Sequence, residues 1–287
     1  MNRRTEGRVE LATIGCRIAG SIGHFLYSNW VGNTIKKYSA TYLMACFQSI
    51  QSPNFLIVFP TSDTASDPTA DRCQLNATLS SSVHDKNELL SFYQQWSDKY
   101  DEDFRTEHYI GPCLTVEAVC ELIPDEKRAD VTVLDVAAGT GLVGLELAKN
   151  GFKVIDAIDG SEAMLTKLRQ KGIYRCTTQA MLGNGGDCES LPENAYDVVT
   201  SSGGFVPGHL PVSAVQDLIR MCKPGGLIVI VMRYEYLNTC EELRPLEPLM
   251  IELEHKNPSC WSRLKRHISP NYLLDKEGIV FVYRKSL

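Results

Sequence analysis

The pattern of apolar and polar positions along the chain changes at about residue 84. Beyond it, short apolar runs typical of buried strands alternate with segments whose apolar residues recur at helical spacing. Strands separated by such helices indicate βαβ units and a parallel sheet. We expect strands at residues 131–136, 153–158, 174–178, 196–201 and 227–232, and helices at residues 142–149, 162–170 and 212–221.

The two ends of this region differ from its centre. Residues 87–100 place apolar side chains at helical spacing, which predicts a helix that packs on another layer, and a second helix is expected over 114–122, before Pro124. Residues 261–268 and 279–284 read as two strands joined by a short polar link. This arrangement indicates an antiparallel hairpin that closes one edge of the sheet.

The first 83 residues carry no pattern that predicts a fold. Residues 61–82 are rich in Ser, Thr, Asp and Ala, as linkers are, and residues 55–59 have the character of a strand. We therefore divide the chain into a poorly ordered or peripheral leader, residues 1–83, and one folded domain, residues 84–287.

Composition and charge exclude some partners. The 287 residues carry a net charge of -6, so the chain lacks the overall positive field typical of non-specific nucleic-acid or anionic-membrane binding. No stretch reaches the roughly 20 apolar residues of a spanning helix. Ten cysteines occur without a Cys-x-x-Cys pair or a zinc-ligand spacing. We expect reduced thiols, no metal site, and a cytoplasmic or nuclear location.

The sharpest motif is the glycine-rich segment at residues 133–144, a strand followed by a turn of small residues and a helix. Gly139 and Gly141 let the backbone approach a ligand, and the amides at the start of the helix favour an anionic group. The Gly-x-Gly-x-x-Gly spelling that ends at Gly144 is equally compatible with a nicotinamide dinucleotide. Asp135, at the end of the strand, favours the ammonium of a methionine moiety over a pyrophosphate.

Two further acids follow neighbouring strands. Asp159 lies 20 positions after Gly139 (159 − 139) and can accept hydrogen bonds from both hydroxyls of a ribose, while Ser161 caps the next helix. Asp187 can accept from an adenine amino group, with the N–H of Cys188 on a ring nitrogen, or it is simply a solvated loop acid. Acids at successive strand ends favour an uncharged nucleoside joined to an amino acid.

These motifs, in this order, resemble those of the class I S-adenosylmethionine (SAM) dependent methyltransferases. The resemblance covers residues 84–287, and segments near both ends of that region resemble a methyltransferase-like subgroup of the superfamily. The segments that carry the resemblance are 133–141, 157–165, 186–199 and 223–226, with 92–101 and 278–285 for the subgroup.

The resemblance implies a Rossmann-like, doubly wound α/β fold. Its sheet is mostly parallel and seven-stranded, with an antiparallel C-terminal hairpin, a helical N-terminal lid, and SAM across the carboxyl ends of the first strands. Ala137 departs from the family, which most often has glycine there. The expected cofactor-binding residues are Trp96, Tyr100, Asp135, Ala137, Gly139, Gly141, Asp159, Gly160, Asp187, Cys188 and Ser201.

No catalytic motif stands out, because SAM itself supplies the electrophile and the protein mainly aligns the acceptor. His209 follows the fourth strand and is the candidate general base, or else an ordinary surface histidine. Tyr234 and Glu235 are alternative contacts for the acceptor. Trp96 and Tyr100 either form an aromatic lid over the methionine end or belong to the core.

Three hypotheses for function follow. The first is a SAM-dependent methyltransferase that acts on a small molecule or an exposed protein side chain. The second is a SAM-binding interaction module without turnover, and the third is an NAD-dependent oxidoreductase. Residues 201–205 lack the Asn-Pro-Pro-Tyr type tetrad, which counts against amino groups of nucleobases or glutamine. The sequence does not identify the acceptor, and it leaves open whether the chain is a monomer or a dimer.

Overall fold

The computed structural model describes residues 71, 77, 85–105, 107–183 and 191–287. Most of the predicted leader and the adenine-site candidates Asp187 and Cys188 lie outside the described residues. Among the described helices, none combines the length and the apolar character that crossing a membrane requires.

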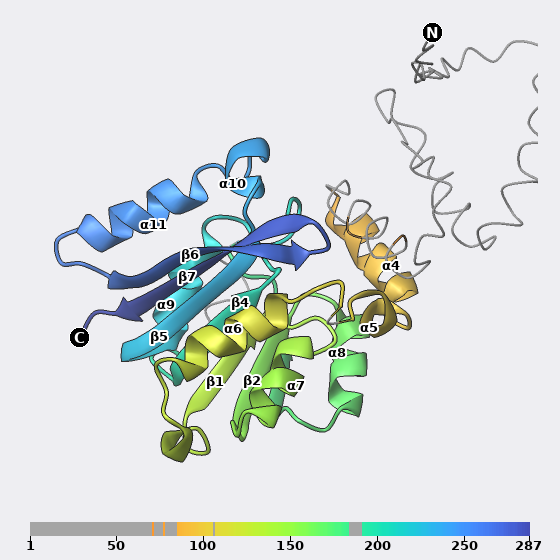
Figure 1. Ribbon diagram of the computed structural model, residues 1–287, viewed down its shortest axis with the longest axis horizontal. Coiled ribbons are helices and arrows are strands. Elements are labelled where there is room, and N and C mark those ends of the chain that lie inside the picture. Colours follow the sequence, from red (N-terminus) through yellow and green to blue (C-terminus); the bar gives the residue numbers. More distant parts are fainter. Residues whose placement is uncertain (1–70, 72–76, 78–84, 106, 184–190) are drawn as a thin grey trace, which may run out of the picture. The chain divides into compact units, whose positions relative to one another are not determined.

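A seven-stranded sheet forms the centre of the domain, with the strand order β3-β2-β1-β4-β5-β7-β6 (Figure 1). The pairs from β3 to β5 are parallel, and β7 is antiparallel to both β5 and β6. The predicted Rossmann-like sheet with an antiparallel C-terminal hairpin is therefore confirmed. The strands are β1 Thr132–Val136, β2 Val154–Asp159, β3 Cys176–Gln179, β4 Tyr196–Ser202, β5 Cys222–Arg233, β6 Trp261–Leu273 and β7 Lys276–Lys285.

Helices cover both faces of this sheet, and strand β5 shows why. Its apolar residues alternate between two cores, because successive side chains of a strand point to opposite faces. Leu227, Val229 and Val231 join the core under α6 and α7, which lie in front of the sheet in Figure 1. Ile228 and Ile230 join the core under α9 and α11. The helices are α4 Lys86–Trp96, α5 Tyr100–Asp103, α6 Gly111–Cys120, α7 Leu142–Lys149, α8 Glu162–Gln170, α9 Ala214–Met221, α10 Tyr236–Thr239 and α11 Leu246–His255, with a 3-10 turn at Asp125–Lys127.

The first helix is shorter than its apolar stripe predicts. The prediction of one helix over 87–100 is wrong at its C-terminal end, because α4 stops at Trp96 and α5 starts at Tyr100. The carboxylate of Asp103 accepts a hydrogen bond from the indole N–H of Trp96 at 2.9 Å. That buried bond folds the two helices onto each other and places their aromatic side chains in one cluster.

Helix α11, which precedes the C-terminal hairpin, was not predicted. Its apolar residues Leu246, Leu249, Met250 and Leu253 follow helical spacing, and they pack on the core that α9 also covers. The signal was present in the sequence, but Pro245 and the charged residues around the segment resemble those of a loop.

We predict that Leu147→Ala, in the contact between α7 and the sheet, lowers the free energy of unfolding by about 2–5 kcal/mol. Leu147 is fully buried, so the substitution removes apolar contacts and leaves a cavity. The control Leu264→Ala truncates a leucine that is 44% exposed and should change stability by less than about 0.5 kcal/mol. Urea unfolding of both variants measures the difference, and equal losses would contradict this description of the core.

Candidate cofactor site

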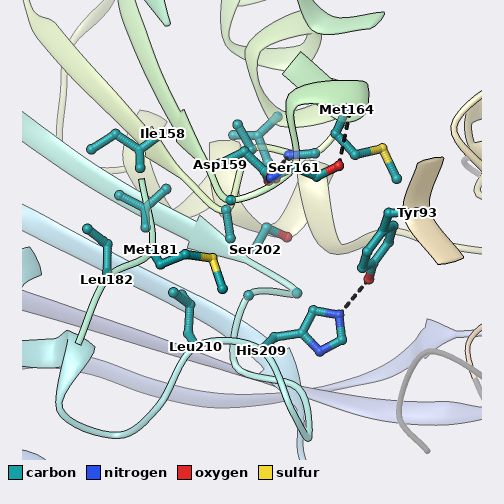
Figure 2. Close-up of a pocket in the computed structure, with 18 of the residues that line it drawn as sticks. Tyr93, Ile158, Asp159, Ser161, Met164, Met181, Leu182, Ser202, His209 and Leu210 are labelled. Atoms are coloured by element: carbon teal, nitrogen blue, oxygen red, sulfur yellow. Dashed lines mark hydrogen bonds between the residues drawn. The ribbon is translucent and has the colours of Figure 1, made fainter. Parts of the chain in front are cut away.

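A cleft opens at the carboxyl ends of β1, β2 and β4, and α4 lines one of its sides (Figure 2). One wall is the glycine turn from Ala137 to Gly139, and a second is the end of β2 from Asp159 to Ser161. Residues that sequence reasoning did not single out complete it: Lys86, Leu89, Leu90, Tyr93, Tyr109, Pro112, Val136, Leu142, Val143, Ile158, Met164, Ala180, Met181, Leu182, Ser202, Gly203, Gly204 and Leu210.

The glycine turn brings bare backbone to the wall of the cleft. Gly139 has a φ of +56°, and a side chain at that position would meet nothing within 4 Å, so its backbone faces open space. Gly144, in contrast, leaves room for a neighbouring ring. A side chain there would collide with the ring of Tyr174, whose hydroxyl accepts the Gly144 N–H at 3.0 Å. The predicted site residue Gly141 shapes the turn, with a φ of +90°, but it does not line the cleft.

Ala137 lies in the cleft wall with a backbone φ of 55°. This left-handed conformation costs an L-residue roughly 1–2 kcal/mol, which explains in physical terms why glycine suits the position. The turn holds alanine because the neighbouring backbone fixes it, since the N–H of Ala138 donates to the carbonyl of Ile158 at 3.2 Å.

Asp159 connects the end of β2 to the glycine turn. One carboxylate oxygen accepts the N–H of Gly139 at 2.8 Å, and the other accepts the N–H of Ser161 at 2.8 Å. Burial raises the pKa of Asp159 above its ordinary value, and the two backbone hydrogen bonds oppose that shift. Each oxygen keeps a second lone pair, so the carboxylate can also accept hydrogen bonds from a ligand in the cleft.

Asp135 is not brought to the wall of the cleft. Its side chain is fully buried and accepts a hydrogen bond from the hydroxyl of Tyr174 at 2.7 Å, with Thr200 Oγ1 at 3.3 Å. Burial raises the pKa of Asp135 to about 7, and both hydrogen bonds oppose the rise. Asp135 is therefore not among the described wall residues that can meet a ligand's ammonium directly.

The α4–α5 segment, over which a helical lid is predicted, lies against the glycine turn. The carboxylate of Asp101 bonds the hydroxyl of Thr140 and pairs with Lys171 at 2.6 Å, while Lys171 also donates to the carbonyl of Thr140 at 2.6 Å. These contacts join α5, the glycine turn and the end of α8. Tyr100 lines the cleft, whereas Trp96 lines a neighbouring cavity instead.

His209 points into the cleft from the loop after β4, and Figure 2 shows its hydrogen bond to Tyr93 on α4. Nδ1 lies 2.8 Å from the carbonyl of Pro207, which can only accept, so Nδ1 carries the proton. Nε2 therefore accepts the hydroxyl proton of Tyr93 at 2.6 Å. Burial lowers the pKa of His209 below its ordinary value, so the ring is neutral at pH 7.

The remaining predicted residues divide between the cleft and its surroundings. Gly160 lines the cleft, and a side chain there would collide with the sulfur of Met181. Ser201 lies behind the wall with its hydroxyl buried, whereas the next residue, Ser202, reaches the cleft and lies 3.1 Å from the Tyr109 hydroxyl. The alternative acceptor contacts Tyr234 and Glu235 do not line it.

Residues 133–226 match the family model described as a methyltransferase domain. Over these residues the chain is similar to methyltransferases. The match begins in β1 and ends within β5, so it spans the glycine turn, Asp159 and His209. The resemblance inferred from the motifs is thereby confirmed.

A human protein is among the relatives of this chain. "Methyltransferase-like protein 27" of Homo sapiens is 35% identical over 153 residues, which are 53% of this chain and 60% of that protein. The "Ubiquinone/menaquinone biosynthesis C-methyltransferase UbiE" of Roseobacter denitrificans is 30% identical over 107 residues, 36% of this chain and 43% of that protein. The matches thus cover less than two thirds of these relatives.

A similar solved structure is that of a magnesium protoporphyrin IX methyltransferase from Synechocystis with bound SAH. It has 14% sequence identity and a TM-score of 0.49, and the match covers 70% of this chain and all of that one.

We predict that Tyr93→Phe raises the pKa of His209, because the lost hydrogen bond favoured the neutral ring. In the wild type this pKa should lie below 6.5, and the fold should lose stability as the pH falls below that value, since the unfolded chain then binds a proton that the native ring refuses. Imidazole proton resonances followed against pH measure both values.

The control for this titration is Tyr109→Phe, which removes a hydroxyl of the same cleft that bonds Ser202 rather than His209. A wild-type pKa above 6.5, or the same change in both variants, would contradict the arrangement of Tyr93 and His209.

Proposed function

We propose that the protein binds SAM in this cleft and transfers its methyl group to an acceptor that is a small molecule or an exposed protein side chain. The observation that carries the proposal is the position of the Asp159 carboxylate, which lies in the cleft wall and holds the amide of the glycine turn. The methyltransferase-domain match to the same residues supports it.

The cleft suits an uncharged nucleoside better than a dinucleotide. In a dinucleotide site the amides of the glycine turn bind the pyrophosphate. Here the N–H of Gly139 is already bonded to the Asp159 carboxylate, whose negative charge would repel a phosphate at that point. A ribose can instead donate its hydroxyl protons to the same carboxylate. This argues against the hypothesis of an NAD-dependent oxidoreductase.

The residues of the cleft fit SAM by the hydrogen bonds and the space that they offer. Asp159 would accept the ribose hydroxyls, and the bare backbone at Gly139 and Gly160 allows close approach. When bound, SAM supplies a methyl group attached to a sulfonium sulfur, and loss of that methyl group leaves a neutral thioether. The protein would place the acceptor, keep water away and remove a proton from the acceptor where its chemistry requires it.

The proton would go to the Tyr93–His209 pair. His209 is neutral, and its Nε2 accepts a hydrogen bond from the Tyr93 hydroxyl. When the Tyr93 oxygen takes a proton from the acceptor, Tyr93 can pass its own hydroxyl proton to Nε2. The imidazolium formed would keep its bond from Nδ1–H to the carbonyl of Pro207.

A second candidate function is a SAM-binding module without turnover, which the strained Ala137 in place of glycine favours. Methyl-labelled SAM incubated with the protein and a cell extract separates the two. Enzyme-dependent label in a small molecule or a protein supports the methyltransferase. Binding of SAM with no transfer to any component supports the module.

We predict that Asp159→Asn weakens SAM binding about tenfold or more, because a charged acceptor for the ribose hydroxyls becomes a neutral one. Isothermal titration calorimetry of SAM with wild type and variant measures the change. Thermal melting of both proteins without SAM shows whether the variant is folded.

The matched control is Asp197→Asn, near the amino end of β4, whereas the cleft lies at the carboxyl ends of the strands. Asp197 also accepts a backbone N–H, from Thr132 at 2.9 Å, and pairs with Lys223 at 2.8 Å, but it does not line the cleft. Its variant should bind SAM within about twofold of the wild type, since no ligand-facing charge is lost. Unchanged SAM affinity in Asp159→Asn would refute the assigned site.

A further inference from the structure

A second cavity adjoins the cofactor cleft at the carboxyl end of β5. The two share Tyr93, Tyr100, Tyr109 and Gly203 in their walls, so the second cavity begins where the first ends. Gly203 is bare backbone at this junction, and a side chain there would collide with the Tyr109 hydroxyl. Its other lining residues are Ala77, Trp96, Phe104, Val206, Arg233, Tyr236, Tyr272 and Leu273.

Aromatic rings form most of this wall, and they support one another. Trp96 and Phe104 have ring centroids 5.3 Å apart, Phe104 and Tyr109 are 5.2 Å apart, and Tyr109 and Tyr272 are 5.3 Å apart. Trp96, Phe104 and Tyr109 lie in the α4–α5 segment or shortly after it. Tyr272 lies in β6, far away in the sequence. Tilted and edge-to-face contacts of this kind hold ring positions and leave faces and edges for a flat apolar ligand.

One charged side chain, that of Arg233, lines this otherwise largely aromatic cavity. Arg233, the last residue of β5, is only 8% exposed, and its guanidinium lies 5.0 Å from the ring centroid of Tyr236. Of its five N–H donors, the hydrogen bond formed within the described part of the chain is that of Nη1 to Glu235, at 3.1 Å. The Glu235 side chain is 42% exposed, so water solvates its carboxylate and weakens its ion pair with Arg233.

The remaining donors of Arg233 are accessible. The buried side-chain polar atoms without a partner in the described residues are Ser201 Oγ and Tyr283 OH, and no nitrogen of Arg233 is among them. A guanidinium in apolar surroundings with open donors is a strong partner for a carboxylate, which it can bind through two parallel hydrogen bonds.

We infer that this cavity binds the methyl acceptor, and that the acceptor is a flat, apolar or aromatic small molecule bearing a carboxylate that pairs with Arg233. The inference rests on the proposed function for its link to methyl transfer. The carboxylate anchors the molecule at β5, the aromatic rings hold its body, and the shared wall at Gly203 and Tyr109 directs its other end towards the cofactor cleft and the Tyr93–His209 pair.

The test measures binding of benzoate and of the neutral benzamide, which has the same shape, to the full chain by ligand-observed NMR titration. Wild type should bind benzoate more tightly than benzamide. Arg233→Met should weaken benzoate about tenfold or more and leave benzamide within about twofold, because only benzoate loses a charge-assisted hydrogen bond. Arg233→Lys, which keeps the charge, should restore part of the benzoate affinity.

Glu235→Gln gives a change of opposite sign. It removes the carboxylate that competes for the guanidinium, so benzoate should bind about two to five times more tightly than to wild type. If Arg233 served only to support the fold through Glu235, this variant would lose stability without gaining affinity for benzoate. Thermal melting of each variant accompanies the titrations.

Three results would overturn the inference: no benzoate binding by wild type at millimolar concentration, equal affinity for benzoate and benzamide, or the same loss of both in Arg233→Met. SAM titration of wild type and of Arg233→Met keeps the two proposals separate. Arg233-dependent benzoate binding by a protein that does not bind SAM would sustain the cavity and refute the proposed function. Normal SAM binding with no preference for benzoate would refute the carboxylate-binding cavity without refuting the proposed function.

Discussion

The carboxylate of Asp159 is the constraint on which the cofactor site depends. It accepts one N–H from the glycine turn after β1 and one from the start of α8, so a single side chain fixes the distance between two neighbouring strand ends. A partly buried carboxylate is helped by such donors to remain charged, and here burial raises the pKa of Asp159 against them. The bonds that position the carboxylate also occupy the amide at which a dinucleotide phosphate would bind.

The lid depends on the same turn. Asp101 bonds Thr140 and pairs with Lys171, which fastens α5 to the glycine turn, and the bond from Trp96 to Asp103 holds α4 against α5. Tyr93 is thereby carried to His209 from an element 116 positions away in the sequence. The glycine turn, the α4–α5 segment and the Tyr93–His209 pair are thus connected. The second cavity continues from this arrangement to Arg233.

The sheet could be predicted from the sequence because its signals are local. Alternating apolar runs mark β1, β2, β4 and β5, and the small-residue turn marks the cofactor edge. The site was predicted only in part. Asp159 is recognisable by its spacing from Gly139, but nothing local shows that Tyr174 and Thr200 would hold Asp135 within the core. The partnership of Tyr93 with His209 and the position of Arg233 depend on long-range packing, which periodicity does not encode.

A crystal structure of the protein with S-adenosylhomocysteine, the demethylated form of SAM, tests the central claim most directly. The account predicts the ribose hydroxyls on the Asp159 carboxylate, with the N–H of Gly139 still bonded to that carboxylate, and the amino-acid end beside the lid. A nucleoside bound away from Asp159, or a Gly139 amide turned towards the ligand in place of the carboxylate, would contradict it.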